Sequence, residues 1–410
     1  MKFKHVVISL LLILILVIFN SVFMKTLIKA NTYFASQSLY NNEVVQPQKL
    51  FDRTWKIVYK EYYDSDLNHQ NWTRWKTHYQ GKIKTDDDAK VAIDTMVASL
   101  NDPYTRFMSK KDFEDLTTSI TSKIYGIGVN IYSNSGKIEV FNVIPATPAD
   151  FAGLKQGDII IAVDGKETNG MNVSEVATLV RGPENSVVEL TILRDSKKIT
   201  KKIKRKEIKI KNVKSSVLDN HIGYIQIVSF MGGTTPNEFM EALENTKNTD
   251  SIIIDLRGNT GGLLDNAVFI ANMFIDNGEI VEIIYRNGYK KSINANNTPK
   301  LLDKPVVVLV NGASASASEI LSGALKDYKK AKLVGKKTFG KGLVQKVVPL
   351  PNQTGLNVTI AKYLTPKGTD INKLGIKPDI EVGNEFDFYL NSSKKDIQLE
   401  TAKEILNAKN

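Results

Sequence analysis

Two stretches decide the fold of this chain, VVVLVNGASASASEI at residues 306–320 and TFGKGLVQ at residues 338–345. The first begins with five apolar residues, which predict a buried strand, and an Asn-Gly pair then breaks the strand. Small Ala and Ser residues follow, after which Ile320, Ala324 and Leu325 recur at helical spacing. The stretch therefore predicts a strand, a tight turn and a helix that begins near the serines.

A serine in such a turn lies at a helix N-terminus, where bare backbone N–H groups and the helix dipole favour a developing oxyanion. The serine also needs a base. The chain contains four histidines, none of which stands in a motif context: His5, His69, His78 and His221.

A buried lysine can replace histidine as the base, because desolvation favours its neutral form. Lys341 is flanked by Gly340 and Gly342, which allow the backbone to approach closely. In an extended chain Lys341 and Gln345 share a face, so Gln345 can orient the amine without adding charge. The second stretch therefore predicts Lys341 as a general base.

These motifs resemble those of the carboxy-terminal processing peptidases, a family of serine peptidases with a Ser-Lys dyad. The resemblance extends from about residue 51 to the C-terminus. It implies that Ser316 is the nucleophile, that Lys341 is the general base and that Gln345 is the orienting group.

A third motif of that family matches DLRGNTGG at residues 255–262. The resemblance implies an oxyanion hole formed by the amides of Gly262 and Ala317. We expect Asp255 and Arg257 to hold the shape of this loop rather than to take part in the chemistry.

Two other interpretations compete with a peptidase. A run of Ala and Ser is typical of tight helix packing. Residues 335–341 also fit the phosphate-binding pattern G-x-x-x-x-G-K, but that pattern needs a Ser or Thr next, where the chain has Gly342, and a following helix, where residues 343–351 favour a strand.

Composition narrows the class further. A chain of 410 residues is long enough for two or three domains. It contains no cysteine, which excludes disulfides and thiolate metal sites, and no His-Glu-x-x-His pattern. We expect neither a metal nor a cofactor.

The net charge of +11 is concentrated in residues 197–214, which contain ten basic residues and one acid. The run partly alternates with isoleucines, so we interpret it as a solvated edge strand that lysines protect from pairing. Attraction to anionic lipid or wall polymers is an alternative. Nucleic acid is the weakest option, because no aromatic residues accompany the charge.

Residues 1–25 contain an uncharged run of nineteen residues, 6–24, after two lysines. At about 1.5 Å per residue, such a helix nearly spans a hydrocarbon core of about 30 Å. The segment is a membrane anchor or a signal peptide. We favour an uncleaved single-pass anchor with the catalytic region outside the cytoplasm; cleavage would make the protein secreted or periplasmic. Residues 26–48 resemble a tether.

Residues 49–117 have helical periodicity, and residues 118–208 resemble a PDZ domain. In such a domain a glycine-containing loop receives a peptide C-terminus on its backbone N–H groups. The resemblance assigns substrate binding to a loop and one later residue: Gly126, Ile127, Gly128, Val129 and Arg181.

Residues 209–383 alternate between strands and helices, which predicts an α/β layer around a mostly parallel sheet. The family resemblance implies a crotonase-like core with an inserted PDZ domain and an N-terminal helical region. Residues 384–410 are expected to form a helical tail.

Taken with the resemblance, the sequence predicts an ATP-independent serine endopeptidase that processes proteins from their C-terminal region. Its expected partners are proteins or peptides with exposed apolar C-termini and the membrane; a homo-oligomer or a regulatory partner is compatible with the sequence, and nucleic acid is not expected. The alternative is a catalytically inactive PDZ scaffold that binds protein C-termini.

Overall fold

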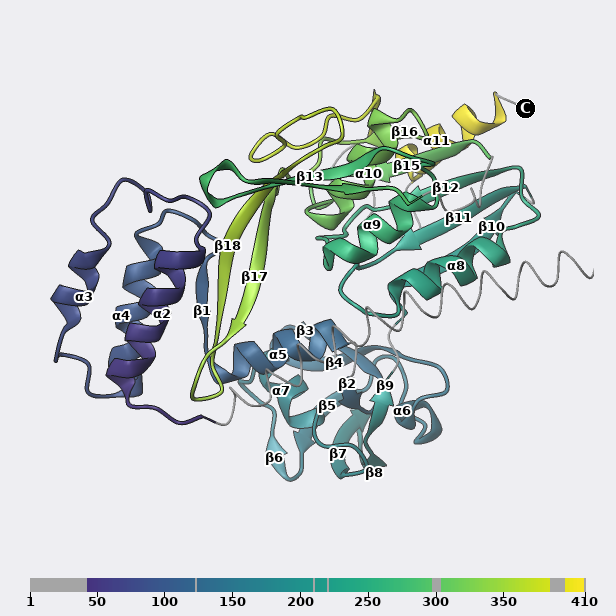
Figure 1. Ribbon diagram of the computed structural model, residues 1–410. Coiled ribbons are helices and arrows are strands. Elements are labelled where there is room, and N and C mark those ends of the chain that lie inside the picture. Colours follow the sequence, from purple (N-terminus) through teal and green to yellow (C-terminus); the bar gives the residue numbers. More distant parts are fainter. Residues whose placement is uncertain are drawn as a thin grey trace, which may run out of the picture.

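The computed structural model describes residues 43–408, apart from 122–123, 209–210, 220, 297–303 and 384–394. These residues form a group of helices, a small β-rich region and a larger α/β region (Figure 1). The predicted membrane segment at residues 1–25 lies outside the described residues. Within those residues, no helix combines the length and the apolar character needed to cross a membrane.

The large region is built on a six-stranded sheet in the order β10-β11-β12-β15-β16-β19. Neighbouring strands are parallel, except that β10 runs antiparallel to β11. The predicted mostly parallel sheet is therefore confirmed. The strands are β10 (Val213–Leu218), β11 (Ile222–Ile227), β12 (Ser251–Asp255), β15 (Val306–Val310), β16 (Lys332–Gly335) and β19 (Ile380–Glu381).

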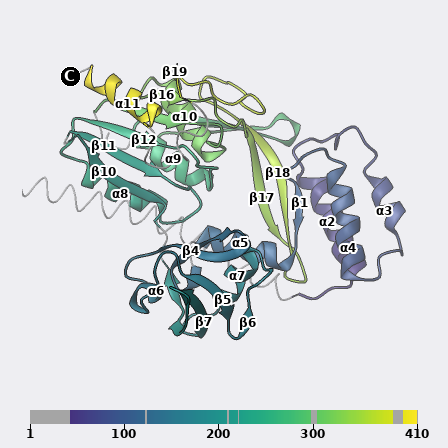
Figure 2. The same ribbon diagram turned by 180° about the vertical axis from the view of Figure 1, so that it is seen from behind.

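Helices cover both faces of this sheet, which explains why its central strands are apolar at nearly every position. Every residue of β12 and β15 is buried. Alternate strand residues pack against α8, α9 and α10 on one face and against α11, yellow in Figures 1 and 2, on the other. These helices are α8 (Thr235–Asn245), α9 (Leu264–Asn272), α10 (Ala317–Asp327) and α11 (Ile397–Asn407).

A second sheet joins the large region to the helices at the N-terminal side. Its order is β1-β18-β13-β14, and β17 pairs with β18. The long strands β17 and β18 extend between the two regions (Figures 1 and 2). The elements are β1 (Arg106–Met108), β13 (Glu279–Tyr285), the 3₁₀ turn η1 (Arg286–Gly288), β14 (Lys290–Asn294), β17 (Leu343–Pro349) and β18 (Gly355–Leu364).

The N-terminal helices are α2 (Pro47–Glu61), α3 (Thr73–Tyr79), α4 (Asp86–Ala98) and α5 (Lys110–Thr121). α4 starts at a capping box between Thr85 and Asp88, and its apolar side chains share one core with Leu356 and Val358 of β18. Two features differ from the sequence expectation. The strand β1 interrupts the helical region, because it pairs with β18, and α5 extends past position 118.

The small region contains the antiparallel sheet β3-β4-β5-β7-β8, with β6 paired to β5 and β2 paired to β9. Lysine-rich β8 lies at the edge of the sheet, as predicted. The elements are β2 (Ile124–Gly126), β3 (Val129–Asn134), β4 (Lys137–Val143), α6 (Pro148–Phe151), β5 (Ile159–Val163), β6 (Lys166–Glu167), α7 (Val173–Val180), β7 (Val187–Arg194), β8 (Lys197–Lys204) and β9 (Lys206–Ile208).

We predict that Gly335→Ala destabilises the central sheet. Gly335 ends β16 with φ +128°, and a Cβ atom there would lie 2.1 Å from the Val310 carbonyl oxygen on the neighbouring strand. Forcing that contact should cost about 1–3 kcal/mol in the free energy of unfolding. Urea denaturation followed by circular dichroism measures this loss. The control is Gly233→Ala, where the added Cβ meets no atom within 4 Å, and an equal loss in both variants would contradict the prediction.

Candidate active site

Three loops meet at the carboxyl edge of the central sheet, where parallel α/β sheets commonly bind ligands. They follow β12, β15 and β16, and they carry the three motifs predicted from the sequence. The topology therefore brings Gly262, Ser316 and Lys341 to one edge of the sheet.

Ser316 is the N-cap residue of α10, in an unusual backbone conformation with φ 56° and ψ −113°. A non-glycine residue in this region is strained, and such strain persists only where neighbours hold it. The predicted strand, turn and helix are confirmed, with α10 starting at Ala317. The turn places Ser316 beside the first N–H groups of the helix.

The glycine pair of the third motif lies against this turn. A Cβ atom on Gly261 would lie 2.8 Å from the Ser316 Cβ, and one on Gly262 would lie 2.2 Å from the Phe230 carbonyl carbon. Both glycines also have positive φ, 103° and 148°. Only glycine fits at either position.

The amides of Gly262 and Ala317, predicted to form the oxyanion hole, are available for this role. Gly262 is bridged to Phe230, yet its own N–H donates to no acceptor in the described residues, and the same is true of the Ala317 N–H. Their joint action on one oxyanion stays a prediction.

A buried carboxylate that sequence analysis did not select joins the serine turn to the lysine loop. Glu319 is 0% exposed and accepts four hydrogen bonds. Its Oε2 accepts from the backbone N–H groups of Ser316 at 2.9 Å and Lys341 at 2.8 Å. Its Oε1 accepts from the Thr338 hydroxyl at 2.5 Å and the Gly340 N–H at 2.7 Å. Burial raises the pKa of Glu319, and these hydrogen bonds oppose the rise.

A buried tyrosine makes a second connection between the same two loops. The Tyr363 hydroxyl lies 2.6 Å from the Lys341 carbonyl oxygen and 3.1 Å from the Ser316 carbonyl oxygen, to both of which it donates. Burial raises the pKa of Tyr363 well above its ordinary value, so the phenol stays protonated as a donor. Ser316 and Lys341 are thus fixed relative to each other through their main chains.

The Lys341 side chain lies against an aromatic ring. Its Nζ is 4.7 Å from the centroid of Tyr104, and among the described contacts it makes no hydrogen bond to the Ser316 hydroxyl. Burial lowers the pKa of Lys341, the Asp102 carboxylate opposes this effect and Arg106 supports it. The predicted hydrogen bond between Lys341 and Ser316 therefore stays a prediction, in an environment that favours a neutral amine.

Among the hydrogen bonds of the described residues, none joins Gln345 to the Lys341 amine. Its Nε2 lies 3.5 Å from the Thr359 hydroxyl on β18, after a bulge between Val344 and Gln345. The strand β17 begins only at Leu343, so the extended geometry assumed from the sequence does not reach back to Lys341. The orienting role of Gln345 also stays a prediction.

The described histidines lie elsewhere. His69 contacts Asp66 on the surface, and His221 interacts with the Asp219 carbonyl and with the Asn407 side chain. Lysine remains the candidate base, because the backbone N–H groups of Lys341 and Ser316 share a Glu319 oxygen, whereas no hydrogen bond in the described residues joins a histidine to Ser316.

A cavity of about 440 Å³ adjoins the lysine loop. Gly340 and Leu343 line it together with Tyr104 and other residues of the N-terminal helical region. Volumes of this size suit small ligands or side chains.

The predicted peptide-binding loop of the small region lies between β2 and β3, and its binding role stays a prediction. Gly128 has φ +89°, and the carbonyls of Ile127 and Gly128 accept from Ala149 and Ile144. Within the described residues the N–H groups of Ile127 and Gly128 have no acceptor, whereas Gly126 and Val129 belong to strands.

Arg181 follows α7 and is half exposed. Its Nη1 lies 3.9 Å from an Asp115 carboxylate oxygen on α5, so its partner in this structure is a helix beside the small region. The substrate-binding role of Arg181 stays a prediction.

Comparison with known proteins identifies the family. The model for "Peptidase family S41" matches residues 221–382, and that for "PDZ domain" matches residues 139–194. The carboxyl-terminal-processing protease of Picosynechococcus sp. is 37% identical over 370 residues, covering 88% of this chain and 89% of the relative. CtpA of Bacillus subtilis, a carboxy-terminal processing protease, is 40% identical over 304 residues, covering 73% of this chain and 65% of the relative.

Two solved protease structures are similar to this chain. A photosystem II D1 C-terminal processing protease has 32% identity and a TM-score of 0.56, covering 88% of this chain and 98% of that one. An S41 protease from Bacteroides fragilis, at 18% identity and a TM-score of 0.56 over 87% of this chain and 97% of that one, shares the fold. The chain belongs to the carboxyl-terminal-processing proteases of peptidase family S41 and is a serine peptidase with a PDZ domain.

We predict that Glu319→Gln lowers both activity and stability. The amide group would turn a donor toward two of the four N–H or O–H groups that Glu319 now accepts from. The loss of buried charge-assisted hydrogen bonds should cost about 1–3 kcal/mol in unfolding free energy. The displaced serine turn should cost about 10²-fold in kcat.

Urea denaturation and the cleavage rate of an unfolded protein substrate measure the two effects. Exposed Glu404 on α11 gives the control, Glu404→Gln. Wild-type rates in Glu319→Gln would exclude the connection made by this carboxylate.

Proposed function

We propose that this peptidase cuts proteins from their C-terminal region outside the cytoplasm, with Ser316 as nucleophile and Lys341 as general base. The observation that carries the proposal is the common anchor of the two residues: their backbone N–H groups donate to the same Glu319 oxygen, at 2.9 and 2.8 Å. The shared acceptor places the two main chains side by side, and we propose that rotation of the Lys341 side chain brings its amine to the Ser316 hydroxyl.

In the proposed reaction, neutral Lys341 removes the Ser316 hydroxyl proton as Oγ attacks the scissile carbonyl carbon. The Gly262 and Ala317 amides stabilise the oxyanion, and the proton passes to the departing amine as the peptide bond breaks. Lys341 then activates water, which hydrolyses the acyl-enzyme to a carboxylate and restores Ser316. Gln345 orients the amine during these steps.

The Lys341 amine lies against the Tyr104 ring in this structure, so the proposed reaction needs a movement of the side chain before the proton transfer. Lys341 must leave the face of Tyr104, which attracts an ammonium group but not a neutral amine. Deprotonation therefore favours the movement toward Ser316.

We further propose that the PDZ domain captures apolar substrate C-termini. The unpaired N–H groups of Ile127 and Gly128 support this role, since they suit a terminal carboxylate. The relatives named above are processing proteases of C-terminal segments, which agrees with such a substrate.

The proposed location outside the cytoplasm is argued from residues 1–25. Its uncharged run at residues 6–24 supports an uncleaved anchor that holds the peptidase at the outer face of a membrane. Detergent extraction of full-length protein, compared with a variant lacking residues 1–25, tests the anchor; equal release of both into the soluble fraction would reject it.

Ser316→Ala and Lys341→Ala should each reduce cleavage by about 10⁴-fold or more, because each removes a reacting group. The substrate is an unstructured protein with an apolar C-terminus, and cleavage is followed by mass spectrometry. Exposed Lys337→Ala is the matched control. Full cleavage by either active-site variant would refute the dyad. Tail binding without cleavage by the wild-type protein would favour a scaffold.

The pH dependence should respond oppositely to two charges near Lys341. Because the neutral amine is the base, kcat/KM rises with pH through the Lys341 pKa. Asp102→Asn removes an attraction for the ammonium, which lowers the pKa and moves the acid limb to lower pH. Arg106→Gln removes a repulsion, which raises the pKa and moves the limb to higher pH. Shifts in the same direction, or none, would exclude Lys341 as the titrating base.

A further inference from the structure

The C-terminal helix reaches the catalytic edge of the sheet through a buried arginine. Arg257 follows β12, in the loop that carries Gly262, and its side chain is 1% exposed. Its Nη2 donates to Asp255 Oδ2 at 2.7 Å and its Nε to both oxygens of Asp255, at 3.0 and 3.1 Å. The expectation that Asp255 and Arg257 have a structural role agrees with this geometry.

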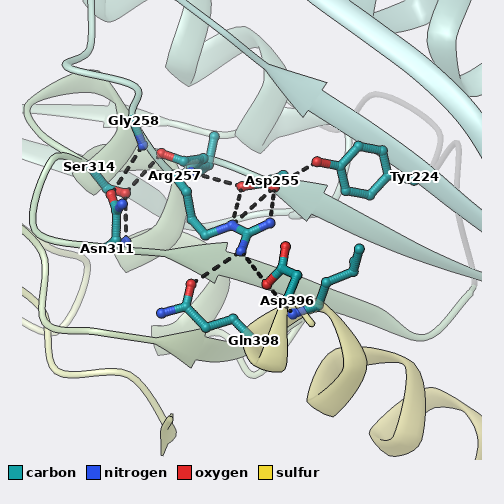
Figure 3. A network of polar contacts seen from close by, with 10 residues as sticks. Tyr224, Asp255, Arg257, Gly258, Asn311, Ser314, Asp396 and Gln398 are labelled. Atoms are coloured by element: carbon teal, nitrogen blue, oxygen red, sulfur yellow. Dashed lines mark hydrogen bonds and ion pairs between the residues drawn. The ribbon is translucent and has the colours of Figure 1, made fainter. Parts of the chain in front are cut away.

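The other side of the guanidinium faces α11. Arg257 Nη1 donates to Asp396 Oδ1 at 2.8 Å and to Gln398 Oε1 at 3.2 Å (Figure 3). Both acceptors come from the start of the C-terminal helix, about 140 residues further along the chain. One arginine therefore contacts the end of a central strand and the last helix at once.

Asp396 has two functions in one side chain. It is the N-cap of α11, where Oδ1 accepts from the Leu399 N–H at 3.1 Å, and the same oxygen accepts from Arg257. Formation of the helix start and neutralisation of the buried arginine are thus coupled. Gln398 is 1% exposed and is itself held by a hydrogen bond from its Nε2 to the Val382 carbonyl.

The loop that begins at Arg257 is bonded directly to the serine turn. Gly258 N–H donates to Asn311 Oδ1, and the Ser314 hydroxyl donates to the Leu256 carbonyl (Figure 3). The Asn259 carbonyl accepts from the Ala315 N–H and the Ser318 hydroxyl. A displacement of Arg257 is therefore passed to the residues on both sides of Ser316.

We infer that the C-terminal helix is part of the catalytic machinery and that Asp396 and Gln398 are positioning residues, which hold the oxyanion loop through Arg257. The inference rests on the proposed function of Gly262 and Ser316. It assigns to the chain's last helix a role that is additional to covering the sheet.

Covering the sheet involves a different part of the helix. Ala402 and Leu406 pack on Ile253 and Leu309, and Lys403 forms ion pairs with Asp219 and Glu400 at 3.1 and 3.2 Å. These contacts do not include Arg257, so the anchoring and positioning functions of α11 can be separated by mutation.

The experiment compares four full-length variants in steady-state cleavage of a protein substrate. Asp396→Ala and Gln398→Ala should lower kcat by about 10- to 100-fold with little change in KM, because misplacement of catalytic groups acts on the transition state. Asp396→Asn keeps the helix cap but removes the charge. Its kcat should lie between the kcat values of the two alanine variants and that of the wild type. Lys403→Ala loosens the helix without touching Arg257, and its kcat should stay within about twofold of wild type.

A second arm measures the loop itself. Hydrogen exchange of the amides in residues 256–262 should accelerate in Asp396→Ala and Gln398→Ala and stay at the wild-type rate in Lys403→Ala. Wild-type exchange and wild-type kcat in both Asp396→Ala and Gln398→Ala would overturn the inference. Equal changes in kcat and in exchange rate in Lys403→Ala would also overturn it, because they would show that α11 acts only by covering the sheet.

The two arms separate the inference from the proposed function. If the wild-type protein does not cleave in a Ser316-dependent manner, the proposed function fails, and the exchange arm alone decides whether α11 controls the loop. If cleavage depends on Ser316 but is unaffected by Asp396 and Gln398, only the inference fails.

Discussion

The site depends on a single buried carboxylate. Glu319 accepts hydrogen bonds from the serine turn and from the lysine loop, two segments that follow different strands of the sheet. Burying a charge is costly unless donors surround it, and here four donors do. Glu319 bonds to the backbone N–H groups of both segments, and the Tyr363 hydroxyl bonds to the carbonyl oxygens of Ser316 and Lys341. The proposed nucleophile and the proposed base are therefore held together by a residue that has no proposed part in bond making.

Two further buried side chains, Arg257 and Tyr363, also hold the main chain of the site through hydrogen bonds. Arg257 connects the loop that carries Gly262 to α11, and the Tyr363 hydroxyl bonds to the carbonyls of Ser316 and Lys341. The main chain of the site is thus rigid, whereas the Lys341 side chain rests on Tyr104, a residue of the N-terminal region. Since Tyr104 precedes β1, which pairs with β18, the position of the amine is linked to the contact between the helical region and the large region.

The buried strands of the central sheet and the close packing of the lysine loop could be predicted from the sequence. Apolar runs such as residues 306–310 predicted buried strands, because a sheet covered on both faces requires them. The glycines beside Lys341 predicted close backbone approach, and Gly340 bears this out, because a Cβ atom there would lie 2.8 Å from the Gly375 nitrogen. Glu319 was missed because three residues after a serine it resembles an ordinary capping residue, and its partners lie about twenty residues away. The contact between Arg257 and Asp396, and that between Lys341 and Tyr104, depend on tertiary packing that periodicity does not encode.

The central claim is that Ser316 becomes nucleophilic through a neutral Lys341 held beside it. The most direct measurement is the rate of covalent labelling by a fluorophosphonate as a function of pH, with the modified residue identified by mass spectrometry. The account predicts labelling at Ser316 that rises with pH through one ionisation and is lost in Lys341→Ala. Labelling of another residue, or labelling of Lys341→Ala at the wild-type rate, would contradict it.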